Sequence, residues 1–293
     1  MPLPGTAEYI TSTSQMQPVK STSQVRRLRL PKLLVFFFLI CRYPVAAQTA
    51  LPDAPSPQKP QAPEETATPT APRISAGQWI RRGLKDQGEI YTAPFHRSAL
   101  KWDVGMVAVT GAFIAADRHI SAQIPSSNLN ISRDLSNVGL YGTLGAVGAS
   151  FVTGVATHDP HAEEAGFLAG EAVGNSAVLF FLMKEISGRE RPLEGQGKGH
   201  FFQYNGVSSS FPSGHAIITW SAATVLAHEY PKPWVKWLAY GTAAAVTVTR
   251  VTGKEHFPSD VIVGSTFGYL IGRHIFHAHC KPGLSEACEG RSP

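Results

Sequence analysis

Three short groups of polar residues in the second half of the chain contain the side chains best suited to chemistry. They are Lys184-x6-Arg191, Ser213-Gly214-His215 and Arg250-x5-His256-x3-Asp260. Each group alone has an ordinary structural explanation, because basic residues cap helix C-termini, Ser caps helix N-termini, and a single histidine is more often a surface residue. The three groups together, at the ends of successive expected helices, favour a chemical explanation.

The cations and the Ser-Gly pair predict a site for a phosphate group. Lys184, Arg191 and Arg250 carry permanent positive charges, and planar guanidinium groups match phosphate oxygens in pairs. Ser213 and Gly214 open an expected helix, whose N-terminus offers free backbone N–H groups to an anion. Without a side chain, Gly214 also lets the anion approach the backbone closely.

The two histidines supply the roles that hydrolysis of a phosphate monoester needs. His256 and His215 can act as a nucleophile and as an acid for the leaving group. Asp260 lies four residues after His256, so it could accept the ring N–H and fix the tautomer. No tight group of histidines or carboxylates with metal-ligand spacing stands out in the sequence. We therefore expect no metal ion and no cofactor.

Together the three groups resemble the type 2 phosphatidic acid phosphatase and haloperoxidase superfamily. This superfamily includes lipid phosphate phosphatases, bacterial nonspecific acid phosphatases and vanadium haloperoxidases. The resemblance is strong from Lys184 to Asp260 and rests on general pattern in the flanking helices. Thr249 stands where the family often has Ser before the third-group arginine, and it keeps the hydroxyl group.

The resemblance implies a role for each matching residue. His256 would attack phosphorus and form a phosphohistidine, with Asp260 orienting it. His215 would protonate the leaving alkoxide and later activate water. Five residues would hold the phosphate oxygens: Lys184, Arg191, Ser213, Gly214 and Arg250.

Three functions stay open at this point. The favoured one is a metal-independent phosphatase acting on lipid phosphates, of the phosphatidate or isoprenoid-pyrophosphate type. The second is a soluble periplasmic acid phosphatase acting on small phosphomonoesters. The third is a vanadium-dependent haloperoxidase, in which the residue matching His256 ligates vanadate. A protein that keeps the fold without the chemistry is disfavoured, because the acid, base and cation positions are intact.

Apolar stretches of helical length, broken by Gly, Pro and Asp clusters, predict an all-α fold. The expected helices span residues 74–86, 102–116, 135–157, 162–187, 213–228, 234–251 and 258–277. We expect a bundle of about six core helices with the active site at one end. Small residues such as Gly139-x2-Gly142-x2-Gly145-x2-Gly148 indicate close helix packing.

Whether the bundle spans a membrane is not decided by the sequence. Residues 138–157 are free of charge and long enough to cross a bilayer, whereas residues 104–116 and 216–227 are shorter and fit buried helices equally well. We favour membrane association. A site outside the cytoplasm then needs an even number of crossings, or none, before Lys184, so at least one of the first long helices should not span.

The N-terminal segments predict export. A basic cluster precedes the apolar run 33–41, and Val45-Ala46-Ala47 follows it, so residues 1–47 read as a secretory signal or a short N-terminal anchor. Residues 48–73 are Pro-rich and predict a disordered linker, ahead of a phosphatase domain at 74–277 and a tail at 278–293. We expect a protein of the cell envelope whose site faces the exterior.

The remaining features exclude some partners and leave other questions open. The net charge of +5 is mild and concentrated in the N-terminal basic cluster, so nucleic acid is not expected as a partner. Cys280 and Cys288 in the tail could form a disulfide or remain as free thiols. The Gly-rich loop 188–211 is either a mobile lid or a plain surface connection. The oligomeric state is not predicted.

Overall fold

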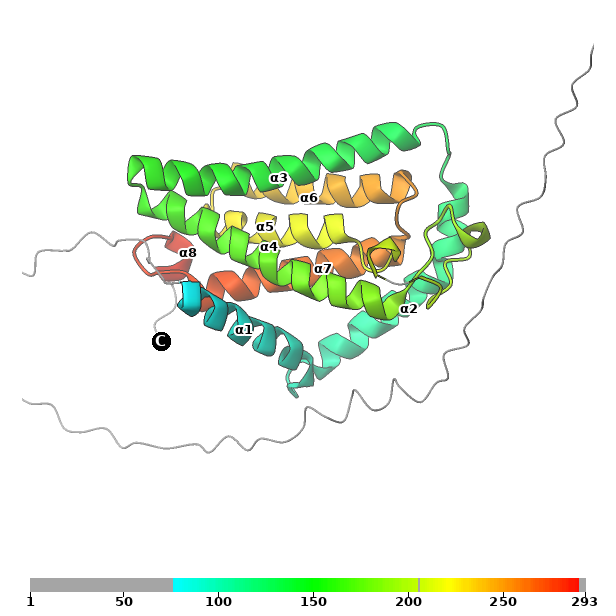
Figure 1. Ribbon diagram of the computed structural model, residues 1–293, viewed down its shortest axis with the longest axis horizontal. Coiled ribbons are helices and arrows are strands. Elements are labelled where there is room, and N and C mark those ends of the chain that lie inside the picture. Colours follow the sequence, from blue (N-terminus) through cyan, green and yellow to red (C-terminus); the bar gives the residue numbers. More distant parts are fainter. Residues whose placement is uncertain (1–75, 205, 290–293) are drawn as a thin grey trace, which may run out of the picture. The chain divides into compact units, whose positions relative to one another are not determined.

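The computed structural model describes residues 76–204 and 206–289, which lie in one compact unit, Glu65–Pro293. These residues form helices and no β-strand, which confirms the predicted all-α class (Figure 1). The long helices are α1 (Ala76–Thr92), α2 (Leu100–Gln123), α3 (Leu129–Thr157), α4 (Pro160–Ser187), α5 (Gly214–Glu229), α6 (Pro233–Thr252) and α7 (Pro258–His279). Short helices are η2 (Ala93–Phe95), η3 (Gly195–Gly197), η4 (Gly206–Ser208) and α8 (Glu286–Glu289).

The predicted helix ranges agree with the structure to within a few residues, with three exceptions: the C-terminal ends of α1 and α2 and the N-terminal end of α3. Helix α2 continues to Gln123 through charged residues that were expected to end it, and one of these, Asp117, is buried. Helix α3 begins at Leu129, six positions before the expected start at Leu135, and α1 continues to Thr92. The predicted signal or anchor (1–47) and the predicted linker (48–73) lie outside the described residues.

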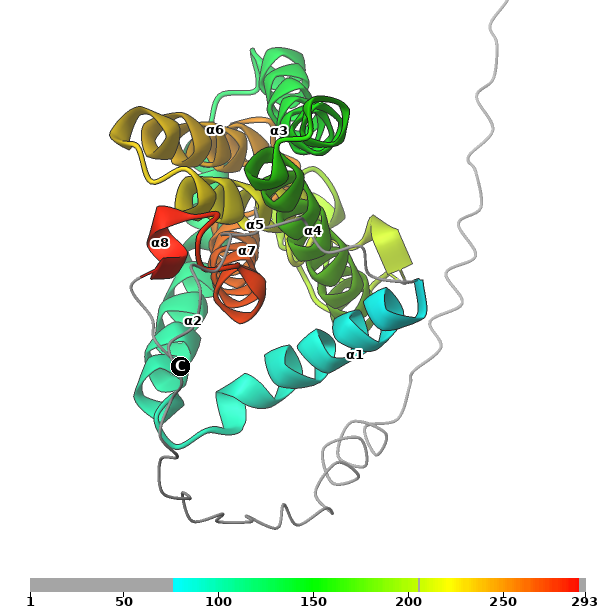
Figure 2. The same cartoon turned by 90° about the vertical axis from the view of Figure 1, so that its left-hand side faces the viewer.

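Helix α5 forms the centre of the bundle. It packs against α7, α4, α6 and α3, and Figure 2 shows it enclosed by these four helices. Its buried side chains are small or medium-sized, among them Ala216, Ile217, Ala222 and Val225. Burying both the apolar and the small polar side chains of α5 places its N-terminal end inside the protein.

Three glycines on α7 set the close contact between α7 and α5. A Cβ atom at Gly264, Gly268 or Gly272 would lie 2.7, 2.4 and 2.4 Å, respectively, from a backbone oxygen of α5 or of its N-cap residue. The four-residue spacing keeps the three glycines on one face of α7. Backbone atoms cannot move aside as a flexible side chain can, so only glycine allows this separation of the two helices.

The glycine series predicted to mediate packing does so only at its first member. Gly139 faces Val246, whose Cγ2 would lie 2.4 Å from an added Cβ atom, but Gly142, Gly145 and Gly148 face open space. The physical reason is the spacing, because three residues fall short of a helical turn by about 60°. Successive members of the series therefore turn away from the neighbouring helix.

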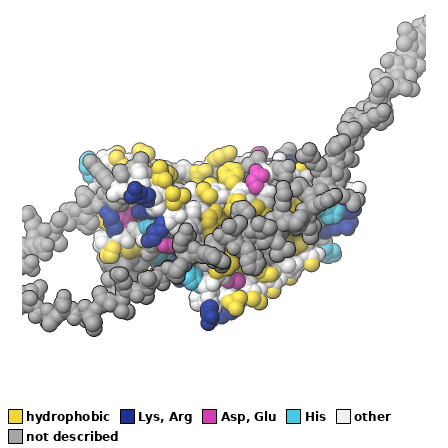
Figure 3. Space-filling view, turned by 60° about the horizontal axis from the view of Figure 1, so that its bottom comes forward, with side chains coloured by type: hydrophobic (Ala, Val, Ile, Leu, Met, Phe, Trp, Pro, Cys, Tyr) yellow, Lys and Arg dark blue, Asp and Glu magenta, His cyan; other side chains and the backbone are white. Residues whose placement is uncertain are grey.

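Apolar side chains are exposed on the outer helices. Helix α3 exposes Leu135, Val138, Tyr141 and Val152, and α2, α4 and α6 have similar exposed residues. Figure 3 shows hydrophobic side chains in several patches along the described part of one face. Helices α3 and α4 are long and apolar enough to cross a membrane, and a third candidate is the α1–α2 pair, which is bent by 85° at its break.

The C-terminal tail is tied back to the bundle. Cys280, just after α7, forms a disulfide with Cys288 in α8, so the structure contains the disulfide rather than two free thiols. The backbone N–H of Lys281 donates to Glu164 Oε1 at 2.7 Å, near the start of α4. The disulfide therefore lies at the end of the bundle where α3 connects to α4.

Candidate functional site

The three predicted groups meet at the other end of the bundle. Lys184 lies in the last turn of α4, His215 in the first turn of α5, and His256 and Asp260 at the junction of α6 and α7. Helix α4 ends at Ser187, and its C-cap is Gly188, which has φ +50°. A Cβ atom on Gly188 would lie 2.3 Å from the backbone oxygen of Tyr204. This glycine lets the chain turn sharply from α4 into the loop that covers the site.

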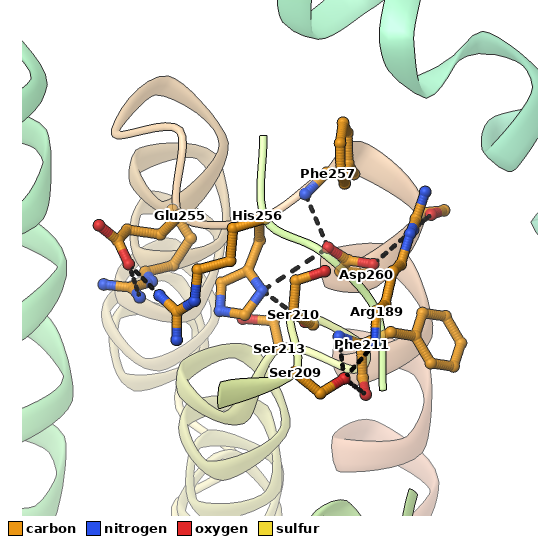
Figure 4. A network of polar contacts seen from close by, with 12 residues as sticks. Arg189, Ser209, Ser210, Phe211, Ser213, Glu255, His256, Phe257 and Asp260 are labelled. Atoms are coloured by element: carbon orange, nitrogen blue, oxygen red, sulfur yellow. Dashed lines mark hydrogen bonds and ion pairs between the residues drawn. The ribbon is translucent and has the colours of Figure 1, made fainter. Parts of the chain in front are cut away.

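His256 is buried, and its tautomer follows from its partners. Ring atom Nδ1 lies 2.7 Å from the backbone oxygen of Ser210 and 3.7 Å from Oδ2 of Asp260 (Figure 4). Both are acceptors, so Nδ1 carries the proton and Nε2 has the free electron pair. Asp260 therefore lies beside Nδ1 as predicted, but the shorter contact of Nδ1 is with the backbone oxygen of Ser210.

Asp260 is held by partners that the sequence analysis did not name. Its Oδ2 accepts from the backbone N–H of Phe257 at 2.8 Å, and its Oδ1 accepts from Arg189 at 2.6 Å (Figure 4). Arg189 is 1% exposed and also donates to Asp117 on α2 at 2.7 Å. The ion pairs of Asp117, Arg189 and Asp260 thus connect α2 to the surroundings of His256.

No sequence signal shows that Arg189 is buried, whereas Arg191, two positions later, was singled out by its spacing from Lys184. Both follow the end of α4, and only the tertiary structure buries Arg189 between the rings of Phe201 and Phe257, whose centroids are 4.8 and 4.4 Å from its Cζ. Arg189 also donates to the backbone oxygen of Gly199 at 3.2 Å. The start of the loop 188–211 is thus anchored to the bundle through the buried side chain of Arg189.

Two of the three predicted phosphate-binding cations, Arg191 and Arg250, contact a carboxylate that was not predicted, Glu255. Arg191 pairs with Glu255, Arg250 lies 3.3 Å from the same carboxylate, and Arg133 of α3 lies 2.6 Å from it. Lys184 donates to the backbone oxygen of Ser209. Glu255 and Arg133 therefore belong to the site, although the sequence analysis assigned them no role.

His215 and Ser213 show how α5 contributes. Nε2 of His215 lies 2.9 Å from Oδ1 of Asn137 on α3, which holds the ring at the site. Ser213 is buried and is the N-cap of α5, with its hydroxyl accepting from the backbone N–H of Ala216 at 3.5 Å. Gly214 is the first helical residue. The hydroxyl of Ser213 thus accepts a capping hydrogen bond, and its own O–H group remains able to donate.

Burial and the surrounding cations favour the neutral form of both histidines. Burial lowers the pKa of His256 to about 4; Asp260 opposes this shift, and Arg250 adds to it. Burial, followed by the charge of Arg250, lowers the pKa of His215 to about 3. The free site therefore holds His256 in the form required of a nucleophile at neutral pH.

A cavity of about 420 Å³ opens beside this site. Its lining combines cations, carboxylates and one apolar residue: Arg133, Arg191, Leu193, Glu194, Ser208, Lys254 and Glu255. The cavity lies on the side where Arg191 and Glu255 meet, and it is large enough for a chemical group attached to a phosphate.

Known proteins share the segment that contains Lys184, His215 and His256. Residues 146–282 match the PAP2 superfamily. The chain is 33% identical over 111 residues to a lipid A 1-phosphatase of Rhizobium etli, covering 36% of this chain and 47% of the relative. It is 36% identical over 97 residues to a lipid A 1-phosphatase of Rhizobium johnstonii, covering 32% of this chain and 39% of the relative. The matches span less than half the length of these relatives.

Among solved structures, the transmembrane PAP2 type phosphatidylglycerolphosphate phosphatase of Bacillus subtilis aligns with 71% of this chain and 98% of its own. Its sequence identity is 21% and its TM-score is 0.44. The family match includes Lys184, His215, His256 and Asp260, on which the predicted resemblance rests. Residues 146–282 of this chain belong to the PAP2 superfamily.

Proposed function

We propose that the chain is a metal-independent phosphatase that hydrolyses phosphomonoesters through a phosphohistidine at His256. The observation that carries this proposal is the buried contact of His256 Nδ1 with Ser210, which leaves Nε2 unprotonated among three cations. A neutral imidazole with a free electron pair, facing a site for a phosphate, is a nucleophile in position.

In the first step Nε2 of His256 attacks phosphorus. The new N–P bond forms as the bond from phosphorus to the ester oxygen breaks, and His215 gives its proton to that oxygen. Lys184, Arg191 and Arg250 bind the phosphate oxygens and stabilise the charge that they carry in the transition state. A bound phosphate also offsets the cationic charges near His215, and this raises the pKa of His215 toward the value that an acid needs.

In the second step a water molecule attacks the phosphohistidine. His215, now neutral, takes a proton from the water, the N–P bond breaks, and inorganic phosphate leaves. The electron pair returns to Nε2 of His256, which restores the starting state. The negative charge of Asp260 stabilises the ring while it is positively charged, at a distance of 3.7 Å from Nδ1.

The substrate class that we propose is a phosphorylated lipid. The exposed apolar side chains of α3 and α4 fit contact with a bilayer, and the relatives with sequence identity above 30% are described as lipid A 1-phosphatases. A lipid held in the membrane would bring its phosphate to the end of the bundle where the cavity beside Arg191 opens. We therefore place the site at the exterior face of a membrane, with the apolar sides of α3 and α4 against it.

The test compares wild-type protein with His256→Ala and with His119→Ala, a control on an exposed histidine of α2. Phosphate release is measured from lipid A, from phosphatidate and from a chromogenic phosphomonoester, with detergent-solubilised full-length protein. We expect His256→Ala to lower kcat by more than about a thousandfold and His119→Ala to leave it unchanged.

Trapping the phosphorylated enzyme is a second test of the same mechanism. With a ³²P-labelled substrate and rapid quenching, wild-type protein should carry an acid-labile, base-stable phosphate, as a phosphohistidine does. Full activity of His256→Ala would refute the nucleophile. A preference for the chromogenic substrate over both lipids would refute the lipid class while leaving the chemistry intact.

A further inference from the structure

A second cluster of ionisable side chains lies away from the phosphate site. It joins Asp86 of α1, Glu171 of α4 and His279 at the end of α7, and one ligand atom from each lies within 4.8 Å of the others. Asp86 is 1% exposed and Glu171 is 3% exposed. Along α7, His279 is about 30 Å from the residues of the phosphate site, at 1.5 Å per residue.

Two carboxylate oxygens in this cluster have no hydrogen-bond partner. They are Oδ2 of Asp86 and Oε1 of Glu171, both fully buried. Their sister oxygens are paired, with Asp86 Oδ1 2.8 Å from Nε2 of His279 and Glu171 Oε2 2.5 Å from Arg82. Leaving a buried carboxylate oxygen without a partner is costly, and two such atoms in one cluster suggest a missing partner common to both.

The positive charges in the cluster do not fully balance its carboxylates when His279 is neutral. Arg82 balances one of the two buried carboxylates, and His279 balances the other only when it is protonated. Beside them His274 lies 3.3 Å from Glu89, and its Nε2 is 4.0 Å from Asp86 Oδ1. These two residues add a further imidazole and a further carboxylate within reach of the same aspartate.

Solvent reaches this region through a hollow of about 420 Å³. Its lining is made of α7 residues: Leu270, Arg273, His274, His277 and Ala278. His274 lines this hollow and also belongs to the outer group with Asp86 and Glu89, so the hollow lies beside the cluster.

We propose that Asp86, Glu171 and His279 bind one divalent transition-metal ion per chain, with Zn²⁺ as the probe. One imidazole nitrogen with two carboxylate oxygens is a donor set that Zn²⁺ accepts, and Glu89 or His274 can complete the coordination. The bound ion takes up the two unpaired oxygens and replaces the proton between His279 and Asp86. Because the ligands come from three helices, the ion fastens α1 to the bundle.

This proposal departs from the expectation, based on sequence spacing, that the protein binds no metal ion. Asp86, Glu171 and His279 are separated by long stretches of chain, so no local motif contains them. Only the packing of α1, α4 and α7 brings them together.

The test uses full-length protein in detergent, stripped with a chelator and titrated with ZnCl2 in a calorimeter. We expect one Zn²⁺ per chain in the wild type. Asp86→Asn and His279→Gln should each weaken the affinity at least about tenfold, since each removes a ligand. Zn²⁺ should raise the Tm of the wild type and not that of either variant. His277→Gln, two positions from His279 on the same helix, is the matched control and should behave as wild type.

Two further measurements distinguish loss of a metal ligand from failure of a variant to fold. Phosphate release should persist in both variants, because their substitutions are remote from the phosphate site. X-ray absorption at the zinc edge of the wild type should show nitrogen and oxygen ligands at about 2.0 Å with imidazole among them. No saturable binding, no imidazole in the zinc spectrum, or unchanged affinity in folded Asp86→Asn would overturn the proposal and leave a network of protonated histidine and carboxylate.

Discussion

At the scale of single residues, the phosphate site contains one side chain whose charge opposes its proposed ligand. Glu255 pairs with Arg191, Arg250 and Arg133, two of which should hold phosphate oxygens. The carboxylate has two effects on the site. It holds the guanidinium groups in place before phosphate arrives, and it competes with phosphate for them once it arrives.

The variant Glu255→Gln separates these two effects. We expect kcat to fall about tenfold, because weaker positioning of the arginines equivalent to one charge-assisted hydrogen bond, about 1.5 kcal/mol, corresponds to about a factor of ten. The inhibition constant for inorganic phosphate should fall at the same time, because the competing charge is gone. Steady-state kinetics with phosphate as inhibitor measures both values. Glu185→Gln, on an exposed residue of α4, is the control, and a rise in the phosphate inhibition constant would contradict the argument.

The titration of His256 gives a second prediction at this scale. Because burial lowers its pKa to about 4, the ring should stay neutral and protonated at Nδ1 as the pH falls from 7 to 5. NMR of protein with ¹⁵N-labelled histidine measures this directly, and His256→Ala identifies the signal. A midpoint near 6.5, the value of a free histidine, would show that the ring is not desolvated as the structure indicates.

At the scale of helices, the contact between α5 and α7 positions the site. Helix α5 brings His215 and its N-terminus to the phosphate, and α7 begins with Asp260 in its first turn. The backbone N–H of Ser213 donates to the backbone oxygen of Asp260 at 3.0 Å, which joins the two helix starts. Close packing along the glycine face of α7 therefore sets the distance between the proposed acid and the proposed nucleophile.

Gly268→Ala tests this packing. Its Cβ atom would lie 2.4 Å from the backbone oxygen of Ile217 and 2.9 Å from Cβ of Trp220, so we expect the free energy of unfolding to fall by about 2 kcal/mol. Gly145→Ala on α3 adds a methyl group to open space and should leave the stability equal or higher. Denaturation in detergent compares the two variants. Equal effects would mean that glycine at 268 does not determine the separation of the helices.

At the scale of the whole molecule, the positions of the disulfide and the phosphate site constrain the topology. Lys184 lies at the site end of α4, and the disulfide lies near the start of α4, where Lys281 contacts Glu164. If α3 and α4 cross a membrane, the two features face opposite compartments. Disulfides persist in oxidising compartments, so a stable disulfide and an exterior site are compatible only if this helix pair does not cross.

The disulfide and an exterior site therefore predict oxidised cysteines in cells. In a Cys41→Ser background, Cys280 and Cys288 should react with a membrane-impermeant maleimide only after a reductant is added, because they face an oxidising exterior. Alkylation of intact cells, followed by gel-shift analysis, measures this. Cysteines that react with a membrane-permeant maleimide without a reductant, together with hydrolysis of an externally supplied substrate, would show that α3 and α4 cross the membrane.

The sequence by itself determined the helical class, the ranges of most helices and the chain segment that carries the site. These follow from local causes, namely apolar stretches of helical length, Pro and Gly at helix ends, and three groups with characteristic spacing. The sequence could not single out Arg189, Asp117, Asn137 or Glu255, because their roles depend on partners 70 or more positions away or on which of several adjacent charges is buried.

The tertiary structure decided how these pieces act together. It assigned the proton on His256 to Nδ1 through a backbone oxygen, which no spacing of side chains encodes. It showed that the closest helix contact involves the glycines of α7, whereas the sequence predicted those of α3. Packing depends on which face of a helix meets a neighbour. It also brought Asp86, Glu171 and His279 together from three helices. Local patterns determine helices and their ends, whereas burial and long-range pairing arise only when the helices pack.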